Sequence, residues 1–386
     1  MINPNEYGSL LFDDKEKEYL SNVIDSRRIF RYSRTDYPYT KMCEEKICEL
    51  VNSKYALCTT NGTSSLKSAM VGAGVSYGDR VLISSYTFLA TALSAIALGA
   101  TAVPIDVDLD YGLNLEDLEN EIKKGCKAVV AVHFQGRTFD LSKVVELCKK
   151  YNVMLIEDAC QAFGSKYKDT YAGTFGDIGV YSFQQFKQIT CGEGGCCVTN
   201  NEAVFNRMRN YTDMGSTRDR FPSWNSEEAL FGENYRMNNL CSAVLYSQLE
   251  KLDDVILRQR KSRSNIMSKL SNINNILTSK DSSGDTCMNI VIILNDKNNK
   301  EDVINYGKEL DIEFRNMWSS LYYDNDLFRR NNLTSIDIKN NECSYTKDLI
   351  EKMLVISIPP ILSSDDEDII VNAINGIKEK GYLSWL

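Results

Sequence analysis

Residues 128–158, AVVAVHFQGRTFDLSKVVELCKKYNVMLIED, decide the fold class of this chain. Two short runs that are apolar throughout, 128–132 and 153–156, stand on either side of a segment with helical apolar spacing, 141–151. A strand that is apolar on both sides must be covered on both sides, which is typical of a parallel sheet between two layers of helices. The stretch therefore predicts strand, helix and strand in an α/β fold.

The same alternation continues in both directions along the chain. Upstream, we expect strands at 81–83 and 102–106 and helices at 87–98 and 115–124, the second helix capped by Asn114. Downstream, we expect one long helical stretch at 237–271, with room for one break, a strand at 288–294, a helix at 301–310, and a closing helix whose capping box pairs Ser364 with Glu367. The composition shifts to Asn, Asp and Lys after the long helix. We therefore predict a large domain, 1–255, whose N-terminal segment packs on a smaller C-terminal α+β domain, 256–386.

The net charge of the chain limits the kinds of partner that it can bind. Its 386 residues carry 44 Lys and Arg against 53 Asp and Glu, a formal net charge of −9. This charge is unfavourable for general binding to nucleic acid or to an anionic membrane surface. No apolar run approaches the roughly 18 residues of a membrane span, and the acidic N-terminal stretch lacks the apolar core of a secretory signal. We expect neither a membrane nor a nucleic-acid partner.

The histidine and cysteine content limits the metal sites and nucleophilic sites that the chain can form. His133 is the only histidine, so zinc clusters that need two histidines are excluded, and any Ser–His or Cys–His nucleophile has to use this residue. The 12 cysteines have no C-x-x-C spacing, and no second cluster completes a four-thiolate site beside Cys191, Cys196 and Cys197. We expect no metal, and we interpret the thiols as reduced and the protein as cytoplasmic.

Polar residues gather where predicted strands end, which is where ligands bind in an open α/β sheet. The turn at 60–65, TNGTSS, leads into a helix whose free amides favour a phosphate, although an ordinary helix cap fits the same residues. Asp158 follows the strand at 153–156, where it either caps a helix or holds a ring nitrogen protonated. Lys187 precedes the glycine-rich turn at 192–195 and is either a solvated surface residue or, when desolvated, a nucleophile.

These features together meet the needs of pyridoxal 5′-phosphate. The cradle anchors the phosphate, Asp158 keeps the pyridine ring protonated, and Lys187 forms a Schiff base and moves protons. The chain has neither a P-loop nor the glycine fingerprint of a dinucleotide site, which disfavours a nicotinamide dehydrogenase.

The ordered segments NGTSSL, YTFLAT, EDACQAFG, YSFQQFK, TCGEGG and NYRM resemble the DegT family of sugar aminotransferases, which have the PLP-transferase fold type I. The resemblance is dense from about residue 50 to residue 260 and thinner beyond, where ISIPP and the last helix still fit. It implies a PLP-dependent aminotransferase that moves an amino group from glutamate or glutamine to a keto-sugar, expected to be nucleotide-linked, in amino-sugar biosynthesis.

The resemblance also implies a role for each matching residue. Lys187 matches the Schiff-base lysine, and Asp158 matches the partner of the pyridine nitrogen. The other implied cofactor contacts are Gly62, Thr63 and Ser64 in the phosphate loop, Phe88 on the ring face, Gln161 near the ring hydroxyl, Ser182 as a further phosphate donor, and Asn234 reaching the phosphate of the neighbouring subunit. The last contact implies a homodimer with shared active sites.

Some positions leave alternatives open. The chain has Gln184 and Phe186 where the family often has His and Thr, and the pair Gln184-Gln185 resembles the cyclitol branch, so a keto-cyclitol (inosose-type) aminotransferase is the alternative. Family members that dehydrate sugars have His in place of the lysine, which argues against a dehydratase here. A PLP-binding regulatory protein without turnover ranks lower. His133 is interpreted as a structural residue of the cleft, with direct proton transfer as the less favoured role.

Overall fold

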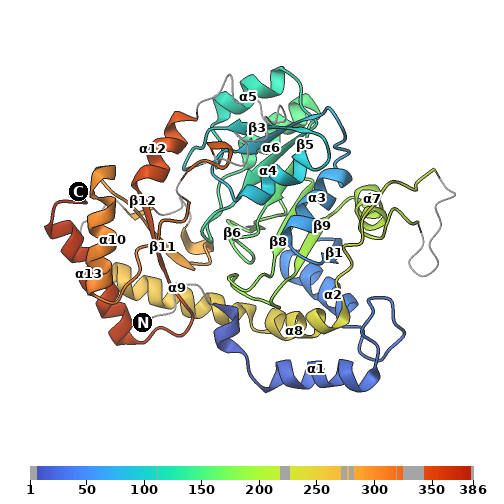
Figure 1. The fold of residues 1–386 in the computed structure, drawn as a ribbon, viewed down its shortest axis with the longest axis horizontal. Coiled ribbons are helices and arrows are strands. Elements are labelled where there is room, and N and C mark those ends of the chain that lie inside the picture. The colour runs from blue at the N-terminus through green and yellow to red at the C-terminus, as the bar shows by residue number, and fades with distance from the viewer. Residues whose placement is uncertain are drawn as a thin grey trace.

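A seven-stranded sheet forms the centre of the molecule, with strand order β1-β9-β8-β5-β4-β2-β3 (Figure 1). The structure is a computed structural model that describes residues 7–110, 112–217, 227–270, 276–277, 282–318, 320–324 and 343–383. The strands of this sheet are β1 (Tyr55–Thr59), β2 (Arg80–Ser84), β3 (Thr101–Ile105), β4 (Ala128–Val132), β5 (Met154–Asp158), β8 (Ile178–Ser182) and β9 (Gly195–Thr199). A two-stranded ribbon, β6 (Lys166–Tyr167) and β7 (Thr170–Tyr171), lies between β5 and β8 in the chain.

The predicted parallel sheet is confirmed, with one reversed strand. Strands β2, β3, β4, β5 and β8 pair in parallel, whereas β9 runs antiparallel to both of its neighbours, β1 and β8. Parallel neighbours need long crossovers, and helices supply them in this sheet except between β5 and β8, where the β6–β7 ribbon lies. No helix separates β8 from β9, so the chain returns beside itself and the residues between them form a loop at the sheet edge where β8 ends.

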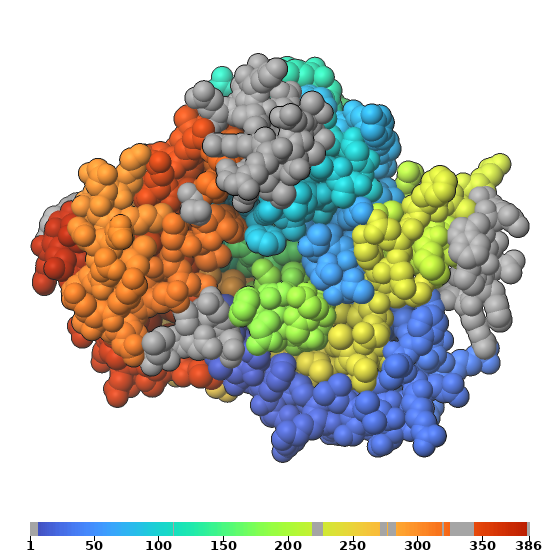
Figure 2. Space-filling view, viewed as in Figure 1, coloured from blue at the N-terminus to red at the C-terminus, as the bar shows by residue number. Residues whose placement is uncertain are grey.

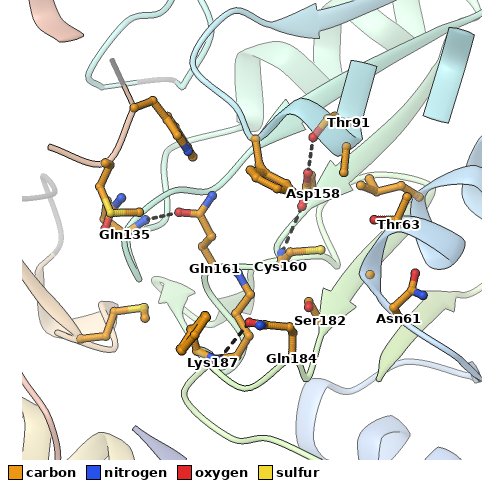
Figure 3. A pocket seen from close by; sticks show the side chains of 18 of the residues that line it. Asn61, Thr63, Thr91, Gln135, Asp158, Cys160, Gln161, Ser182, Gln184 and Lys187 are labelled. Atoms are coloured by element: carbon orange, nitrogen blue, oxygen red, sulfur yellow. Dashed lines mark hydrogen bonds between the residues drawn. The ribbon is translucent and has the colours of Figure 1, made fainter. Parts of the chain in front are cut away.

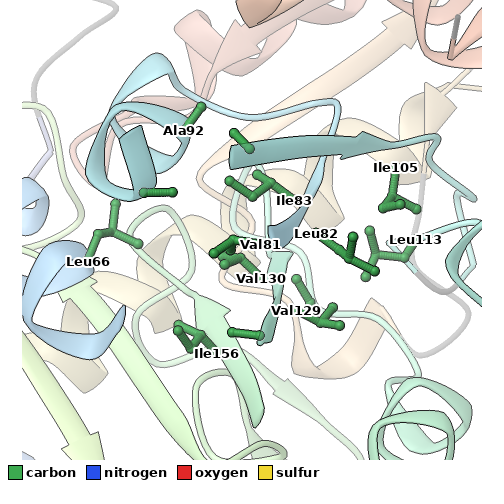
Figure 4. Close-up of a cluster of buried hydrophobic side chains, with 14 of the residues drawn as sticks. Leu66, Val81, Leu82, Ile83, Ala92, Ile105, Leu113, Val129, Val130 and Ile156 are labelled. Carbon is green, nitrogen blue, oxygen red and sulfur yellow. The ribbon is translucent and has the colours of Figure 1, made fainter. Parts of the chain in front are cut away.

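Helices cover both faces of the sheet. They are α1 (Asp14–Ser26), α2 (Tyr39–Val51), α3 (Gly62–Gly72), α4 (Leu89–Ile96), α5 (Leu115–Lys123), α6 (Ser142–Tyr151), α7 (Glu202–Thr212), α8 (Asn239–Glu250), α9 (Leu252–Lys269), α10 (Lys300–Glu309), α12 (Ser344–Lys352) and α13 (Ser364–Glu379). Alternate residues of β9 enter different cores, because Cys197 packs with α3 whereas Cys196 and Val198 pack with α2 and α8. Figure 4 shows part of the first core, in which Leu66 of α3 and Ala92 of α4 lie near Val81, Ile83 and Ile156 of the strands.

Most predicted element positions are confirmed. Asn114 caps α5, with its Oδ1 accepting the Asp117 N–H at 3.0 Å. The long helical stretch is broken once, at Lys251 between α8 and α9. The predicted capping box of Ser364 and Glu367 is wrong by one residue, because Ser363 and Asp366 bond reciprocally and Ser364 is already helical. The sequence SSDDE contains both pairs at the same spacing, so spacing does not distinguish them.

A second sheet, β10-β11-β12, is built from β10 (Ile276–Leu277), β11 (Asn289–Ile293) and β12 (Met353–Ser357). Residues of α9, α10 and α13 form its own core on one face, whereas Val291 and Val355 from the opposite face join the core of the large sheet. The predicted division at 255–256 falls inside α9 and stays a prediction. No helix among the described residues is long and apolar enough to cross a membrane.

Candidate active site

A cavity of about 710 Å³ opens between the large sheet and the second sheet (Figure 3). It lies at the ends of β5 and β8, as expected for a ligand site in this kind of sheet. Seven of the nine predicted site residues line it: Gly62, Thr63, Phe88, Asp158, Gln161, Ser182 and Lys187. The two that do not are Ser64 and Asn234.

Asp158 is the last residue of β5 and is 5% exposed. Its carboxylate accepts a hydrogen bond from Thr91 Oγ1 at 2.8 Å and another from the Cys160 N–H at 3.2 Å. Thr91 Oγ1 in turn lies 2.7 Å from the Oγ1 of Thr87, four residues earlier and just before α4. These contacts fix the orientation of a carboxylate that borders the cavity, which is what a partner for a protonated ring nitrogen requires.

The residue before it, Glu157, has a different environment, because successive side chains of a strand point to opposite faces. Glu157 is fully buried and accepts hydrogen bonds from the Gly173 and Gly176 N–H groups at 2.8 and 2.6 Å. Its Oε2 also lies 2.8 Å from Nε2 of the buried His133. His133 therefore holds a structural carboxylate behind the cavity and does not line the cleft, contrary to the interpretation from the sequence.

The start of α3 forms the turn that was predicted to hold a phosphate. Asn61 caps the helix, and its Oδ1 accepts both the N–H and the hydroxyl of Ser64 at 2.8 Å. Ser64 is thus turned toward the cap, which explains why its hydroxyl is not part of the cavity wall. A Cβ placed on Gly62 would lie 2.9 Å from the Ser182 Cβ, so only glycine allows the helix start and the end of β8 to approach this closely.

Lys187 lies on the loop between β8 and β9. The backbone of this loop is held by hydrogen bonds from Gln185 N to Gly192 O at 2.9 Å and from Cys191 N to Phe183 O at 3.0 Å. The side-chain amine has no hydrogen-bond or ion-pair partner within the described parts of the chain. The loop therefore presents a fixed backbone and an available amine to the cavity.

Of the three other predicted residues, two border the cavity and one lies outside it. Gln161 borders the cavity, and its Oε1 accepts the Gln135 N–H at 3.4 Å. Phe88 precedes α4 and remains 59% exposed beside the cavity. Asn234 is exposed outside the cavity of its own chain, in a β-bridge with Asp213.

The sequence interpretation missed the side of the cavity that the second sheet provides. Tyr7, Asn289, Arg315, Met317 and Trp318 line that side. No local motif marks them, because they come from the N-terminal segment and from two separated places after residue 285. Gln135 had a usable signal, since it follows the predicted strand at 128–132 and strand ends were expected to hold the ligand.

The residues present fit pyridoxal phosphate. A helix start with a glycine in close contact with Ser182, a buried and oriented carboxylate, and an available lysine amine border a single cavity. They match, in order, a phosphate, a pyridinium nitrogen and an aldehyde.

Comparisons with known proteins agree with this fit. Residues 12–375 match the DegT/DnrJ/EryC1/StrS aminotransferase family, which confirms the predicted family and, at the level of the family, the predicted enzyme class and cofactor. A GDP-perosamine synthase of Escherichia coli O157:H7 is 38% identical over 248 residues, 64% of this chain and 66% of the relative. A putative L-glutamine:3-amino-2,3-dideoxy-scyllo-inosose aminotransferase of Micromonospora echinospora is 30% identical over 245 residues, 62% of this chain and 57% of the relative.

The fold is also that of a solved aminotransferase. An aminotransferase structure from Psychrobacter cryohalolentis superimposes with a TM-score of 0.84 at 25% identity, covering 96% of this chain and 98% of that one. The predicted fold class is therefore confirmed. The sequence matches to the two curated relatives are shorter, at about two thirds or less of the length of each.

Proposed function

The chain belongs to the DegT/DnrJ/EryC1/StrS aminotransferase family, and we propose that it moves an amino group from glutamate or glutamine to a nucleotide-linked keto-sugar in amino-sugar biosynthesis. The observation that carries this proposal is the single cavity shared by Lys187, Asp158 and the Gly62–Ser182 contact. The similarity to a GDP-perosamine synthase supports a nucleotide-linked sugar as the acceptor.

The predicted cofactor residues that line the cavity each have a part in this function. Bound pyridoxal phosphate supplies an electron-withdrawing ring that makes a proton on the neighbouring substrate carbon acidic. Gly62, Thr63 and Ser182 hold the phosphate, and Phe88 covers one face of the ring. Asp158, oriented by Thr91, holds the ring nitrogen in its protonated form.

Lys187 anchors the cofactor before the reaction and afterwards holds and moves the proton at its Nζ. A side chain in this position has to be unpaired and near the reacting carbon, and the loop between β8 and β9 leaves the amine without a partner in the described structure. A lysine here also favours amino transfer over the dehydratase chemistry that family members with histidine perform.

The proposal includes a homodimer. Asn234 lies outside the cavity of its own chain, and Glu233 beside it forms an ion pair with Lys67 of α3. We expect this ion pair to fix the loop, so that the loop presents Asn234 to the cofactor phosphate of a second subunit.

The cysteines bear on the location of the protein. The 12 cysteines form no disulfide, which supports a cytoplasmic location.

The test follows the bound cofactor and the turnover. L-glutamate or L-glutamine alone should change the visible absorbance of purified holoenzyme, and a keto-sugar should reverse the change. Lys187→Ala should lose steady-state turnover, whereas Lys149→Ala, on the exposed face of α6, should keep it. Turnover of Lys187→Ala at the wild-type rate would falsify the assignment.

The keto-cyclitol alternative rests on Gln184 and Gln185 and on the similarity to the inosose aminotransferase. Both glutamines have local structural partners: Gln184 Oε1 accepts the Phe186 N–H at 2.9 Å, and Gln185 Nε2 donates to Ser9 Oγ at 3.1 Å. Gln185 is thus accounted for without a substrate, whereas Gln184 also lines the cavity. A higher kcat/KM for a keto-inositol than for a nucleotide-linked keto-sugar would decide for the cyclitol.

A further inference from the structure

The loop between β8 and β9 brings two further polar side chains to the cavity, Gln184 and Glu193, which the proposed function has not used. We call them the loop pair. Figure 3 shows Gln184 next to Ser182 and Lys187, which come from the same stretch of chain. Successive side chains of a strand point to opposite faces, so Gln184, two residues after Ser182, continues the face of β8 that borders the cavity. The loop pair therefore lies beside the amine that the proposed reaction employs.

The backbone of the loop places the two side chains opposite each other. β8 and β9 are antiparallel, and Ser182 and Gly195 are their last paired residues before the loop. Two backbone hydrogen bonds continue the pairing into the loop, from the N–H of residue 183 to the carbonyl of residue 194 at 2.8 Å and from the N–H of residue 185 to the carbonyl of residue 192 at 2.9 Å. Gln184 lies between the two donors and Glu193 between the two acceptors, so the register puts one opposite the other.

The amide group of Gln184 has a fixed oxygen and an available NH₂ group. Its Oε1 accepts the Phe186 N–H at 2.9 Å, and its backbone carbonyl accepts the Lys187 N–H, also at 2.9 Å. Its Nε2 has no hydrogen-bond partner among the residues that the structure describes. Because the oxygen is held by the backbone, Gln184 offers a ligand in the cavity its two amide N–H donors.

Glu193 supplies the complementary acceptor. It is exposed, its backbone carbonyl accepts the Cys191 thiol at 3.3 Å, and its carboxylate has no partner within the described parts of the chain. Among the described residues that line the cavity, Asp158 and Glu193 are the two carboxylates, and the proposed function already assigns Asp158 to the ring nitrogen. A carboxylate accepts hydrogen bonds and repels anions, so Glu193 disfavours a phosphate or carboxylate group as the ligand of the loop pair.

We propose that the loop pair recognises a hydroxyl group of the acceptor, on the ring carbon next to the carbon that takes the amino group. A hydroxyl group accepts one hydrogen bond and donates another, so it can accept from Gln184 Nε2 and donate to the Glu193 carboxylate. The position follows from Lys187, because the loop pair adjoins this lysine and the proposed reaction moves a proton at its Nζ. The assignment rests on the proposed function, which makes the acceptor a keto-sugar.

The experiment compares the keto-sugar with its analogue that lacks the hydroxyl group beside the carbonyl carbon. Wild-type holoenzyme should prefer the keto-sugar about tenfold or more in kcat/KM, because a site built to bind a hydroxyl group disfavours a substrate without one. Gln184→Met and Glu193→Ala should each lose most of this preference. Glu193→Gln keeps an acceptor oxygen without the charge and should give an intermediate preference.

Three measurements show that the variants change recognition and not the loop as a whole. The cofactor absorbance, the kcat for the deoxy analogue and the L-glutamate concentration that half-saturates the absorbance change should each stay within about twofold of wild type. Glu146→Ala removes an exposed carboxylate from α6 and is the control, with the preference of wild type. A preference for the hydroxyl group that persists in Gln184→Met and Glu193→Ala would overturn the proposal.

Other parts of an acceptor are separated by their own probes. GDP and UDP carry the diphosphate without the sugar, and they should inhibit wild type and both variants equally. Weaker inhibition of Gln184→Met, with the preference for the hydroxyl group intact, would overturn the proposal and assign Gln184 to the diphosphate. A keto-inositol has the same kind of hydroxyl group. A higher kcat/KM for keto-inositol, lowered by both substitutions, would retain the loop pair with a cyclitol as its ligand.

Binding without reaction separates this proposal from the proposed function. GDP-mannose and UDP-glucose have ring hydroxyl groups but no carbonyl group to aminate. In a calorimetric titration of wild-type holoenzyme, at least one of them should bind more tightly than its free nucleoside diphosphate, and Gln184→Met and Glu193→Ala should abolish the difference. This result in a protein that transaminates no keto substrate would retain the loop pair and reject the proposed function. No difference in wild type, or an equal difference in wild type and both variants, would reject the loop pair even if the enzyme is an aminotransferase.

Discussion

The two sides of the cavity are built from different kinds of sequence. The phosphate side comes from segments that each end a strand or start a helix of the large sheet: 60–65, 158–161 and 182–187. The opposite side joins Tyr7 to Asn289, Arg315 and Ser357 through side-chain hydrogen bonds across the second sheet. The first side has the residues that the proposed reaction needs at the cofactor, whereas the second is a network of side-chain hydrogen bonds. Substitutions on the two sides should therefore fail in different ways.

The largest effect is expected for Asp158→Asn. The amide keeps the shape of the side chain but cannot balance a positive ring nitrogen, and losing a buried ionic partner costs about 3–5 kcal/mol. This corresponds to a fall in kcat of about 10³-fold for donor and acceptor alike. The measurement is single-turnover kinetics of both half-reactions. A loss confined to one half-reaction would contradict the division between the two sides.

Glu157→Gln should lower the stability of the fold and leave the rate of catalysis unchanged. An amide has one acceptor oxygen, so its NH₂ group would face a glycine N–H in either orientation, that of Gly176 or that of Gly173 beside His133. We expect the free energy of unfolding to fall by about 3 kcal/mol, measured by urea unfolding. The folded fraction should keep its kcat. Asp254→Asn on the exposed face of α9 is the control and should leave the unfolding curve in place.

Thr91→Val removes the hydroxyl that orients Asp158 without changing the shape of the side chain. One hydrogen bond to a charged group is lost, so kcat should fall about tenfold. Ser94→Ala, one turn later on the same helix, removes a hydroxyl that bonds the Ala90 carbonyl and should have little effect. Equal rates in Thr91→Val and wild type would mean that the backbone alone orients Asp158.

The smallest effect is expected on the opposite side, for Tyr7→Phe. The variant loses a buried hydroxyl that bonds Asn289 and Ser357, worth about 1 kcal/mol. We expect the free energy of unfolding to fall by about this amount, measured by urea unfolding, and kcat to stay within about twofold of wild type. A tenfold loss of kcat without a loss of stability would contradict the difference between the two sides.

The sequence predicted the phosphate side better than the opposite side for a physical reason. Lys187, Asp158 and Gly62 are placed by elements only a few residues away, so alternation of strands and helices indicates where they meet. Ser64 was expected at the phosphate, but its contacts with Asn61 depend on the choice of cap. Arg315 and Tyr7 meet through pairing of β11, β12 and the N-terminal segment, and no spacing within a short window encodes such a contact. Phe88, Gln161, Ser182 and Asn234 gained their roles only from the family resemblance, whereas the roles of Asp158 and Lys187 were also argued from the residues.

The bond between Tyr7 and Ser357 joins residues 350 positions apart, and this separation has a consequence in time. At about 5–20 residues per second, a ribosome needs roughly 20–70 seconds to add the intervening chain. The β8–β9 loop with Lys187 is complete long before Ser357 is made. The residues of the phosphate side are thus synthesised well before Ser357, so the opposite side of the cavity can be completed only after them.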